Sequence, residues 1–222
     1  MCQNIDTKDI IGIVSTTILA GTALIAPYIS ERLKYTYRKP KLKIEFNLSP
    51  PDCHLTHMRG TSVDFPVYYF RFVVKNIGKT PAEECEVFLE KIYKENSEGV
   101  MVKNHNFSPV NLKWSGIRDQ FKRTIYPDKE MYCDIGRVHH PGSGYKSIYI
   151  GITPQEQQSN KFVFELPEIY YSQWDCLVPG KYKFIVSVYS RNSEKIGREF
   201  NLSWTGIWKD KEPEMFNELI IS

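Results

Sequence analysis

Residues 67–76 read VYYFRFVVKN and carry the clearest structural signal in the chain. Apolar side chains alternate along this stretch, so one face of an extended chain would carry Tyr68, Phe70, Phe72 and Val74. Successive side chains of a β-strand point to opposite faces, so this alternation is typical of a strand with one buried face. The sequence NIGK at residues 76–79 then predicts a tight turn.

Similar alternating segments recur on both sides of this stretch. Further strands are predicted at residues 41–48, 84–90, 130–136, 146–152, 161–166, 181–188 and 199–204. The turn sequences VPGK and RNSE precede the last two. No strand–helix–strand rhythm is visible, so we expect residues 41–205 to form an all-β, antiparallel β-sandwich, with a small β-barrel as the alternative.

Residues 70–89, FRFVVKNIGKTPAEECEVFL, resemble the strand–NxG–strand element of immunoglobulin-like sandwiches of the CARDB/NEW3 type in prokaryotic surface and membrane proteins. The sequence VPGKYKFIVSVYS at residues 178–190 is similar to the closing strands of the same class. The resemblance implies an immunoglobulin-like fold and a binding or spacer module. It carries over no functional residue, because a fold alone does not define an activity.

Residues 10–29, IIGIVSTTILAGTALIAPYI, contain no charged side chain. A helix of this length extends about 30 Å, which matches the hydrocarbon core of a bilayer. The acidic flank before it differs from the basic start of a signal peptide. We therefore predict a short N-terminus at residues 1–9 and one transmembrane helix at residues 10–29.

The charge distribution predicts the orientation of this helix. The net charge is −1 over residues 1–30, +5 over residues 31–43 and −1 over residues 44–222. Basic flanks stay in the cytoplasm, so the N-terminus would lie outside and the C-terminal domain inside. Five cysteines with no CxxC pair agree with reduced thiols. We expect a single-pass protein of the cell membrane.

Two sets of residues are predicted to act at the membrane. The basic juxtamembrane segment at residues 30–40 and the end of the span would contact lipid headgroups through Tyr28, Arg32, Lys34, Tyr35, Tyr37, Arg38 and Lys39. The small residues Gly12, Thr16 and Ala20 form a ridge through which spans could assemble into a homo-oligomer. The alternative is that such residues are simply common in single spans.

The loop RVHHPGSGYK at residues 137–146 is the candidate ligand site. Successive N–H groups of a glycine-rich loop can form a nest for an anion, such as a phosphate or a nucleotide. The residues expected to contact this ligand are Arg137, His139, His140, Ser143 and Lys146. The alternative is a hairpin-type loop with solvated charges.

Residues 52–57, DCHLTH, include the side-chain types that bind Zn²⁺. No second ligand pair with regular spacing follows, so we predict no metal site. The sequence also lacks the motifs GxxxxGK[ST], GxSxG, HExxH, CxxC and GxGxxG, and we expect neither catalysis nor a cofactor. The basic excess is confined to one short segment, which argues against nucleic-acid binding.

Three remaining segments have no clear strand pattern. Residues 49–63 and 98–122 are expected to be long loops. The tail at residues 206–222 is expected to contain a short helix over residues 213–222, with Pro213 in its first turn and with Met215, Phe216, Leu219 and Ile220 on one face. We expect this face to pack on the sandwich, and binding to a partner or to the membrane surface is the alternative.

These observations support three hypotheses about function. The first is a membrane-anchored protein whose cytoplasmic β-sandwich binds a protein partner or a small ligand without catalysis. The second is an effector, similar in plan to small prokaryotic antiviral effectors, in which the β domain senses a nucleotide and the spans assemble to perforate the membrane. The third is an extracellular spacer or adhesion module with the reverse topology.

Overall fold

The computed structural model describes residues 27, 30–31, 39–59, 64–116, 121–143, 160–166 and 176–222. The chain divides into two compact units, Met1–Lys39 and Pro40–Ser222. The predicted transmembrane helix lies outside the described residues except for Pro27, and the predicted strand at 146–152 lies outside them entirely. Within the described part of the chain, no helix has the length and apolarity needed to cross a membrane.

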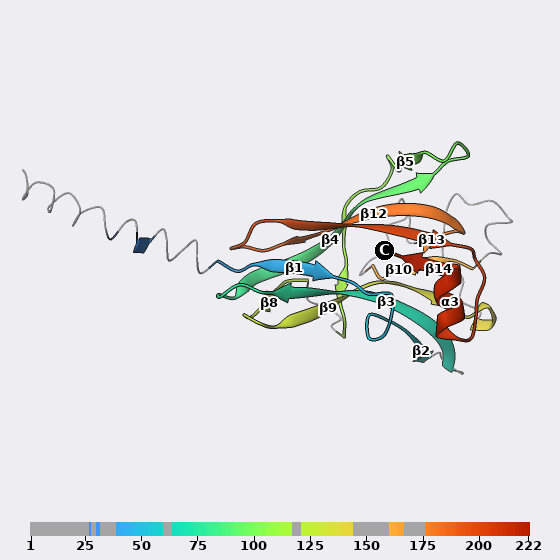
Figure 1. The fold of residues 1–222 in the computed structure, drawn as a ribbon, viewed down its shortest axis with the longest axis horizontal. Helices are drawn as coiled ribbons and strands as arrows, with labels where there is room; N and C mark the ends of the chain where they lie inside the picture. Colours follow the sequence, from blue (N-terminus) through green and yellow to red (C-terminus); the bar gives the residue numbers. More distant parts are fainter. Residues whose placement is uncertain are drawn as a thin grey trace, which may run out of the picture. The chain divides into compact units, whose positions relative to one another are not determined.

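The second unit is built from two antiparallel sheets (Figure 1). The first sheet has the order β1 (Leu42–Glu45), β3 (Asp64–Asn76), β9 (Glu130–His139), β10 (Phe162–Phe164) and β11 (Cys176–Leu177), with β2 (Cys53–Arg59) beside β3 and β7 (Lys113–Trp114) beside β9. The second has the order β14 (Leu219–Ile221), β13 (Ile196–Trp204), β12 (Gly180–Tyr189), β4 (Ala82–Glu95) and β5 (Met101–Lys103), with β6 (Val110–Asn111) and β8 (Arg123–Ile125) beside β4. The 3-10 turn η1 (Pro141–Ser143) follows β9, and helix α3 (Glu212–Glu218) precedes β14.

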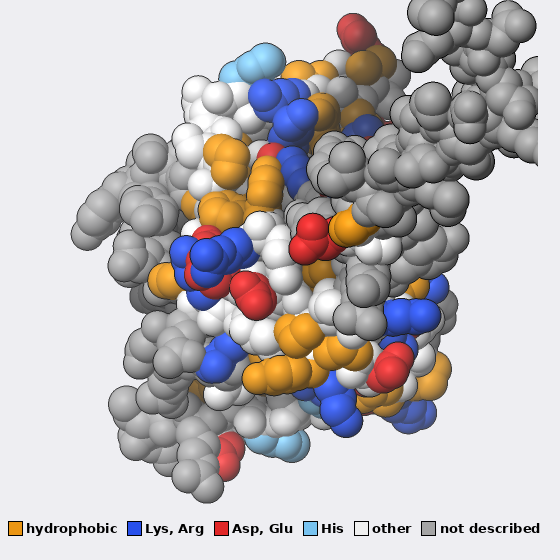
Figure 2. Space-filling view, turned by 90° about the vertical axis from the view of Figure 1, so that its left-hand side faces the viewer, with side chains coloured by type: hydrophobic (Ala, Val, Ile, Leu, Met, Phe, Trp, Pro, Cys, Tyr) orange, Lys and Arg blue, Asp and Glu red, His pale blue; other side chains and the backbone are white. Residues whose placement is uncertain are grey.

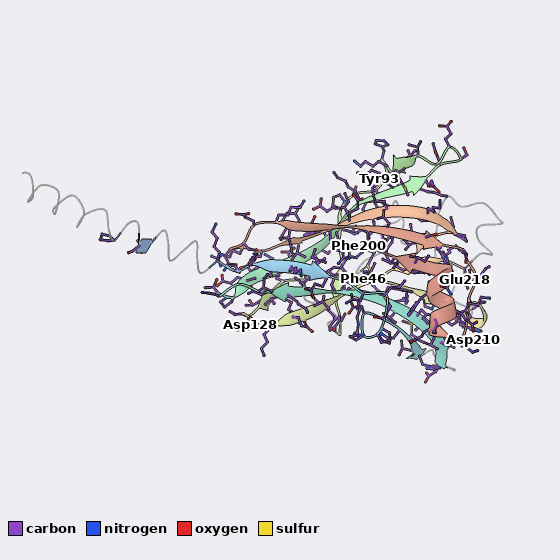
Figure 3. All side chains as sticks on the ribbon, viewed as in Figure 1. Phe46, Tyr93, Asp128, Phe200, Asp210 and Glu218 are labelled. Atoms are coloured by element: carbon purple, nitrogen blue, oxygen red, sulfur yellow. The ribbon has the colours of Figure 1, made fainter. Side chains whose placement is uncertain are left out.

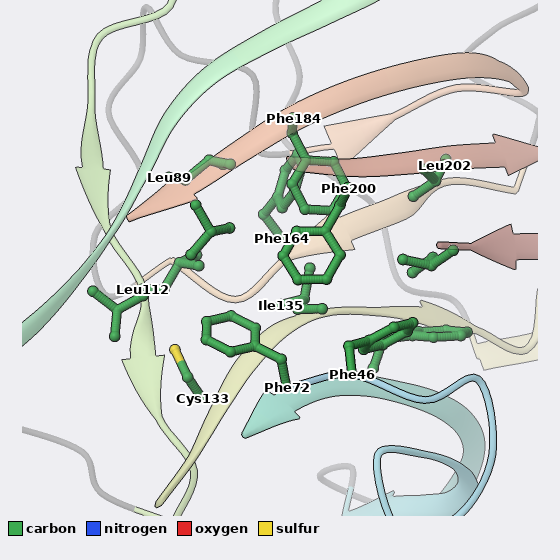
Figure 4. Packing of buried hydrophobic residues seen from close by; sticks show 14 of the residues in the cluster. Phe46, Phe72, Leu89, Leu112, Cys133, Ile135, Phe164, Phe184, Phe200 and Leu202 are labelled. Carbon is green, nitrogen blue, oxygen red and sulfur yellow. The ribbon is translucent and has the colours of Figure 1, made fainter. Parts of the chain in front are cut away.

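The two sheets enclose an aromatic core (Figure 4). Phe200 of β13 stacks on Phe184 of β12 with ring centroids 5.2 Å apart. The same ring meets Phe72 of β3 at 5.8 Å and Phe46, which follows β1, at 5.5 Å. Phe200 therefore joins the two sheets, and the predicted antiparallel β-sandwich is confirmed.

Burial follows the alternation seen in the sequence. The four apolar residues of β3 that were predicted to face inward are fully buried, as are their counterparts on β4 and β12; these are Tyr68, Phe70, Phe72, Val74, Cys85, Val87, Leu89, Tyr182, Phe184, Val186 and Val188. Side chains on the opposite face of β3 are mainly half-buried, except for the buried Val67 and Val73. The cysteines at positions 53, 85, 133 and 176 are free and buried, as expected for reduced thiols.

The two predicted long loops contain strands, so that prediction is wrong in part. Residues 49–63 include β2, which pairs with β3 from Cys53 opposite Phe70 to Arg59 opposite Asp64. Residues 98–122 include β5, β6 and β7, of two or three residues each. Strands this short have no measurable period, and they form because the long strands β4 and β9 offer them hydrogen-bond partners.

The C-terminal tail is part of the sandwich. Helix α3 has Pro at its first turn, as predicted, and its Met215 is fully buried. The predicted helix continues too far, because residues 219–221 form β14 on the edge of the second sheet. Strand geometry turns Leu219 and Ile221 inward and leaves Ile220 46% exposed. The prediction that Ile220 belongs to the apolar face that packs on the sandwich is therefore wrong.

Candidate functional site

Arg137, the centre of the predicted ligand site, lies in a polar network on the outer face of the first sheet. Its guanidinium pairs with the carboxylate of Glu165, which follows β10 and is 9% exposed. The hydroxyl of Tyr69 donates to Glu165 Oε1 at 3.3 Å, and Lys113 Nζ lies 3.8 Å from Glu165 Oε2. The charge of Arg137 is therefore balanced within the protein.

His139 belongs to the same network. Arg137 Nε donates to His139 Nε2 at 2.8 Å, so this nitrogen acts as an acceptor and the imidazole is neutral. Burial, and secondarily the nearby charge of Arg137, lowers the pKa of His139 to about 4. His139 consequently positions Arg137 and carries no charge for an anionic ligand near neutral pH.

His140 points to a different part of the molecule. Its ring packs edge-on against Trp208, with centroids 5.2 Å apart. His140 also accepts two hydrogen bonds from η1, since Gly142 N–H donates to His140 Nδ1 at 3.0 Å and Ser143 N–H donates to its carbonyl oxygen at 2.9 Å. The N–H groups of Gly142 and Ser143, which were expected to form part of an anion nest, thus have partners within the loop. Gly144 and Lys146 lie outside the described residues.

The zinc-like cluster of residues 52–57 is divided between structural roles. Asp52 Oδ2 accepts from the N–H of Asn47 at 2.8 Å. Cys53 faces the core, and its burial raises the pKa of the thiol far above the usual range. His57 is exposed at the other end of β2. Among the described residues, no group of three His, Cys, Asp or Glu side chains could hold a metal ion.

The residues predicted to act at the membrane fall almost wholly outside the described residues. Lys39 is described and half-buried. The remaining predicted lipid contacts and the ridge of Gly12, Thr16 and Ala20 are not among the described residues. Both assignments therefore stay predictions.

A site that the sequence did not indicate lies where the chain enters the sandwich. Asn76 is fully buried at the end of β3, and its side chain makes four hydrogen bonds. Its Oδ1 accepts from Lys41 N–H at 3.2 Å and from Gly78 N–H at 3.0 Å. Its Nδ2 donates to the carbonyl oxygens of Thr80 and Ile125, each at 2.8 Å. This one amide joins the chain entry, the β3–β4 turn and the strand before the β8–β9 turn.

Backbone hydrogen bonds around Asn76 add to the four that its side chain makes. Ile77 N–H donates to the carbonyl oxygen of Lys41 at 2.8 Å. Asn76 N–H donates to the carbonyl oxygen of Lys129 at 3.0 Å, and Asp128 N–H donates to that of Asn76 at 2.9 Å. Asp128 adopts the left-handed conformation, with φ 57°, which the tight β8–β9 turn requires. The two turns and the chain entry thus form one fixed corner of the sandwich.

This corner exposes large apolar side chains among lysines. Ile77 is 50% exposed and Tyr126 is 62% exposed. Six exposed side chains lie at this corner, and we call them the entry surface: Lys41, Ile77, Lys79, Tyr126, Asp128 and Lys129. Figure 3 labels Asp128 at the end of the sandwich where β1 begins, and Figure 2 views this end, where hydrophobic side chains lie among charged ones.

A groove of about 370 Å³ opens between β1 and β13. Its walls are Leu42, Lys43, Ile44, Ile196, Gly197 and Arg198. Arg198 spreads its guanidinium over Phe200, 5.0 Å from the ring centroid, and Lys43 pairs with Glu45 at 2.9 Å. The side-chain charges of Arg198 and Lys43 thus already interact with neighbouring residues of the sandwich.

Two kinds of surface follow from this geometry. The polar network around Arg137 is enclosed and balanced, which suits a structural role. The entry surface is exposed, apolar at its tips and rich in lysine, which suits contact with an amphipathic, negatively charged partner.

Comparison of the chain with protein-family models and with curated proteins finds no match.

Proposed function

We propose that this chain is a non-catalytic, membrane-anchored protein whose β-sandwich binds a protein partner or a small ligand at the cytoplasmic face of the cell membrane. The observation that carries the proposal is the fixation of Lys41. Both its N–H and its carbonyl oxygen are held at the Asn76 corner, so the sandwich begins directly within the basic segment. The domain is therefore tethered closely to the uncharged segment at residues 10–29.

The length of the tether limits how far the sandwich can lie from the predicted span. Residues 30–40 separate the two. A fully extended chain covers at most about 3.6 Å per residue, so the sandwich begins within about 40 Å of the end of the span. The charge of +5 over residues 31–43 supports a cytoplasmic domain. The four free, buried cysteines agree with this compartment.

We further propose that the sandwich is immunoglobulin-like. In that fold strands A, B and E share one sheet, while C, F and G share the other. The corresponding strands here are β1, β3 and β9 in the first sheet and β4, β12 and β13 in the second. This order supports the resemblance to CARDB/NEW3-type modules, which usually bind a partner or act as spacers.

Two further properties remain predictions. An anionic ligand at Arg137 would have to compete with Glu165 for the guanidinium. Thermal stabilisation by inorganic phosphate that the R137M variant abolishes would support such a ligand. Assembly of spans through Gly12, Thr16 and Ala20 would be weakened by leucine at these positions, as the perforating-effector hypothesis requires.

The anchor is tested by alkaline carbonate extraction of membranes from cells that express the full chain. We expect the chain to remain in the membrane pellet. The variant I18R/L19R should move to the supernatant, because each arginine at the centre of a span costs about 3 kcal/mol. The matched control V100R adds a charge on the exposed β4–β5 hairpin and should stay in the pellet. Wild-type protein in the supernatant would overturn the proposal.

The orientation is tested with a membrane-impermeant thiol reagent. The described cysteines are buried and do not report on topology in the native state, so the probe is V100C in a C2S background. Val100 is 54% exposed. Labelling only after permeabilisation of the cells would support a cytoplasmic domain. Labelling of intact cells would instead favour the extracellular spacer.

A further inference from the structure

We infer that the entry surface docks on anionic lipid headgroups beside the predicted span, with Ile77 and Tyr126 in the interfacial layer of the bilayer. This inference rests on the proposed function, because it requires the sandwich to be held at a membrane. It extends that function by assigning one face of the sandwich to the lipid and leaving the other surfaces for a partner.

The first argument is the exposure of two apolar side chains on a fixed backbone. Ile77 is 50% exposed and Tyr126 is 62% exposed. Ile77 follows Asn76, whose backbone is bonded to Lys129 and Asp128. Tyr126 follows Ile125, whose carbonyl oxygen accepts a hydrogen bond from the Asn76 side chain. An exposed isoleucine at a turn loses contact with water when it enters the interfacial layer. A tyrosine ring is amphipathic and is enriched at that depth in membrane proteins.

The second argument is charge. The entry surface carries Lys41, Lys79 and Lys129 against one carboxylate, that of Asp128. The cations next to it are balanced by carboxylates of the sandwich: Lys75 pairs with Glu45 at 2.8 Å and with Glu130 at 3.2 Å. Further along the same end, Lys122 and Arg191 both pair with Glu84, at 3.1 and 3.5 Å. The positive excess is thus concentrated beside Ile77 and Tyr126.

The third argument is position. The chain enters the sandwich at Lys41, whose carbonyl oxygen is bonded to Ile77 N–H. The tether that limits the distance to the bilayer therefore ends at this surface. Another exposed apolar pair, Val100 and Val102, lies at the far end of β4, a strand of 14 residues, where Val102 is opposite Lys94. At about 3.3 Å per residue this places the pair about 40 Å from the entry surface.

The test uses the full chain in vesicles, with an environment-sensitive fluorophore on a single introduced cysteine. I77C carries the probe on the entry surface, and V100C carries it at a site of similar exposure on the β4–β5 hairpin, both in a C2S background. Vesicles contain phosphatidylcholine alone or with about one third phosphatidylserine, together with a lipid that bears a quencher at headgroup depth. We expect quenching at position 77 and none at position 100.

Charge reversal then tests the role of the lysines. Each lysine near an anionic surface contributes about fivefold to partitioning, so K79E/K129E should lower the ratio of docked to undocked chain, obtained from quenching at position 77, more than tenfold in phosphatidylserine vesicles. The matched variant K181E/K183E alters two lysines of β12 that pair with Glu95 and Glu199, and it should leave quenching unchanged. Raised salt should act in the same direction as K79E/K129E.

The outcomes separate this inference from the proposed function. Chain that is retained by the vesicles but unquenched at position 77 overturns the inference and leaves the anchor in place. Equal quenching at positions 77 and 100 also overturns it, because the contact would not be specific to the entry surface. If quenching at position 77 changes neither with the phosphatidylserine content nor with K79E/K129E, then anionic lipid is not the partner of the entry surface. Chain that does not associate with vesicles contradicts both proposals.

Discussion

The side-chain amide of Asn76 donates a hydrogen bond to the carbonyl oxygen of Ile125 at 2.8 Å, although the two residues are 49 positions apart. The bond connects the end of β3 in the first sheet to the end of β8 in the second. The same amide holds Lys41, where the chain enters the sandwich. Asn76 therefore couples the start of the sandwich at Lys41 to both sheets.

Replacement of Asn76 by alanine should destabilise the sandwich. The change leaves the carbonyl oxygens of Thr80 and Ile125 without their donor and the N–H groups of Lys41 and Gly78 without their acceptor. An unsatisfied buried group costs about 1–3 kcal/mol, and some of these groups can reach water at the corner, so we expect a total loss of about 3 kcal/mol. Urea unfolding of the wild type and N76A measures it.

Two variants control this prediction. N76D keeps an acceptor oxygen and loses the donor, so it should also destabilise the protein. N111A removes a half-buried side chain that makes one long bond, 3.4 Å, to Glu86, and it should change the free energy of unfolding by less than about 0.5 kcal/mol. Equal effects of N76A and N111A would mean that the corner is held mainly by its backbone bonds.

Long strands could be predicted from the sequence because their burial alternates over many residues. β3, β12 and β13 follow this rule, and the four inward residues predicted for β3 are all buried. β6 and β7 have two residues each and no period to detect. β2 lies in a segment of mixed polarity, and its place is set by pairing with β3.

The candidate sites could be predicted less well, because they depend on contacts between distant segments. The sequence indicates that Arg137 is basic and lies near a glycine-rich loop. The sequence does not indicate that Glu165 contacts the guanidinium. That contact exists because β10, which Glu165 follows, pairs with β9, and this pairing cannot be predicted from the sequence. Asn76 was interpreted as a turn residue, and its four bonds became visible only once three segments met.

Gly136 should not tolerate alanine. A Cβ atom at this position would lie 2.4 Å from the carbonyl oxygen of Val163 and 2.7 Å from the ring of Phe162. The carbonyl belongs to β10, so relief requires a shift of that strand away from β9. We expect G136A to lose about 1–3 kcal/mol of unfolding free energy, as in other overpacked interiors.

The matched control for this substitution is G197A. A Cβ atom at Gly197 would have its nearest neighbours at 3.4 and 3.5 Å, which is close to ordinary contact. Gly197 also lies in a strand that pairs with β12, so both variants place alanine in a sheet. G197A should stay within about 0.5 kcal/mol of the wild type. Similar losses for the two variants would show that steric contact with β10 is not the cause.

The ion pair of Arg137 and Glu165 should show strong coupling in a double-mutant cycle. Both side chains are largely enclosed, with 16% and 9% exposed. E165M leaves Arg137 without its carboxylate partner and should cost about 3–5 kcal/mol. R137M should cost less, because Lys113 Nζ still lies 3.8 Å from Glu165 Oε2. The double variant R137M/E165M should lose clearly less than the sum of the two. Additive losses would indicate that the two charges do not depend on each other.

A surface pair provides the comparison for that cycle. Lys181 and Glu95 lie 3.2 Å apart, and the lysine side chain is 61% exposed. Exposed pairs contribute about 0–1 kcal/mol because solvent screens them. The K181M/E95M cycle should therefore give a coupling energy of less than about 1 kcal/mol. A coupling as large as that of Arg137 and Glu165 would contradict the role assigned to burial.

His139 should make the stability of the sandwich depend on pH below neutrality. Its pKa in the folded protein is lowered to about 4 from the ordinary value of 6.5, because burial and the charge of Arg137 oppose protonation. Between these two values the unfolded chain binds the proton more readily, so the free energy of unfolding falls as the pH falls from about 6.5 to about 4. The full loss is about 3 kcal/mol, and above pH 6.5 His139 has no effect of this kind.

The variant H139Q tests this prediction, since glutamine retains an oxygen that can accept from Arg137 Nε and does not titrate. Unfolding free energies should be compared between pH 7 and pH 5. Glu45, whose pKa is lowered to about 2 mainly by its hydrogen bonds to Lys75 and Lys43, adds its own loss only below about pH 4.5. The wild type should lose stability across the chosen range and H139Q should lose much less. Equal slopes would show that the buried imidazole accepts a proton in the folded state as readily as in the unfolded chain, and that Arg137 does not hold it neutral.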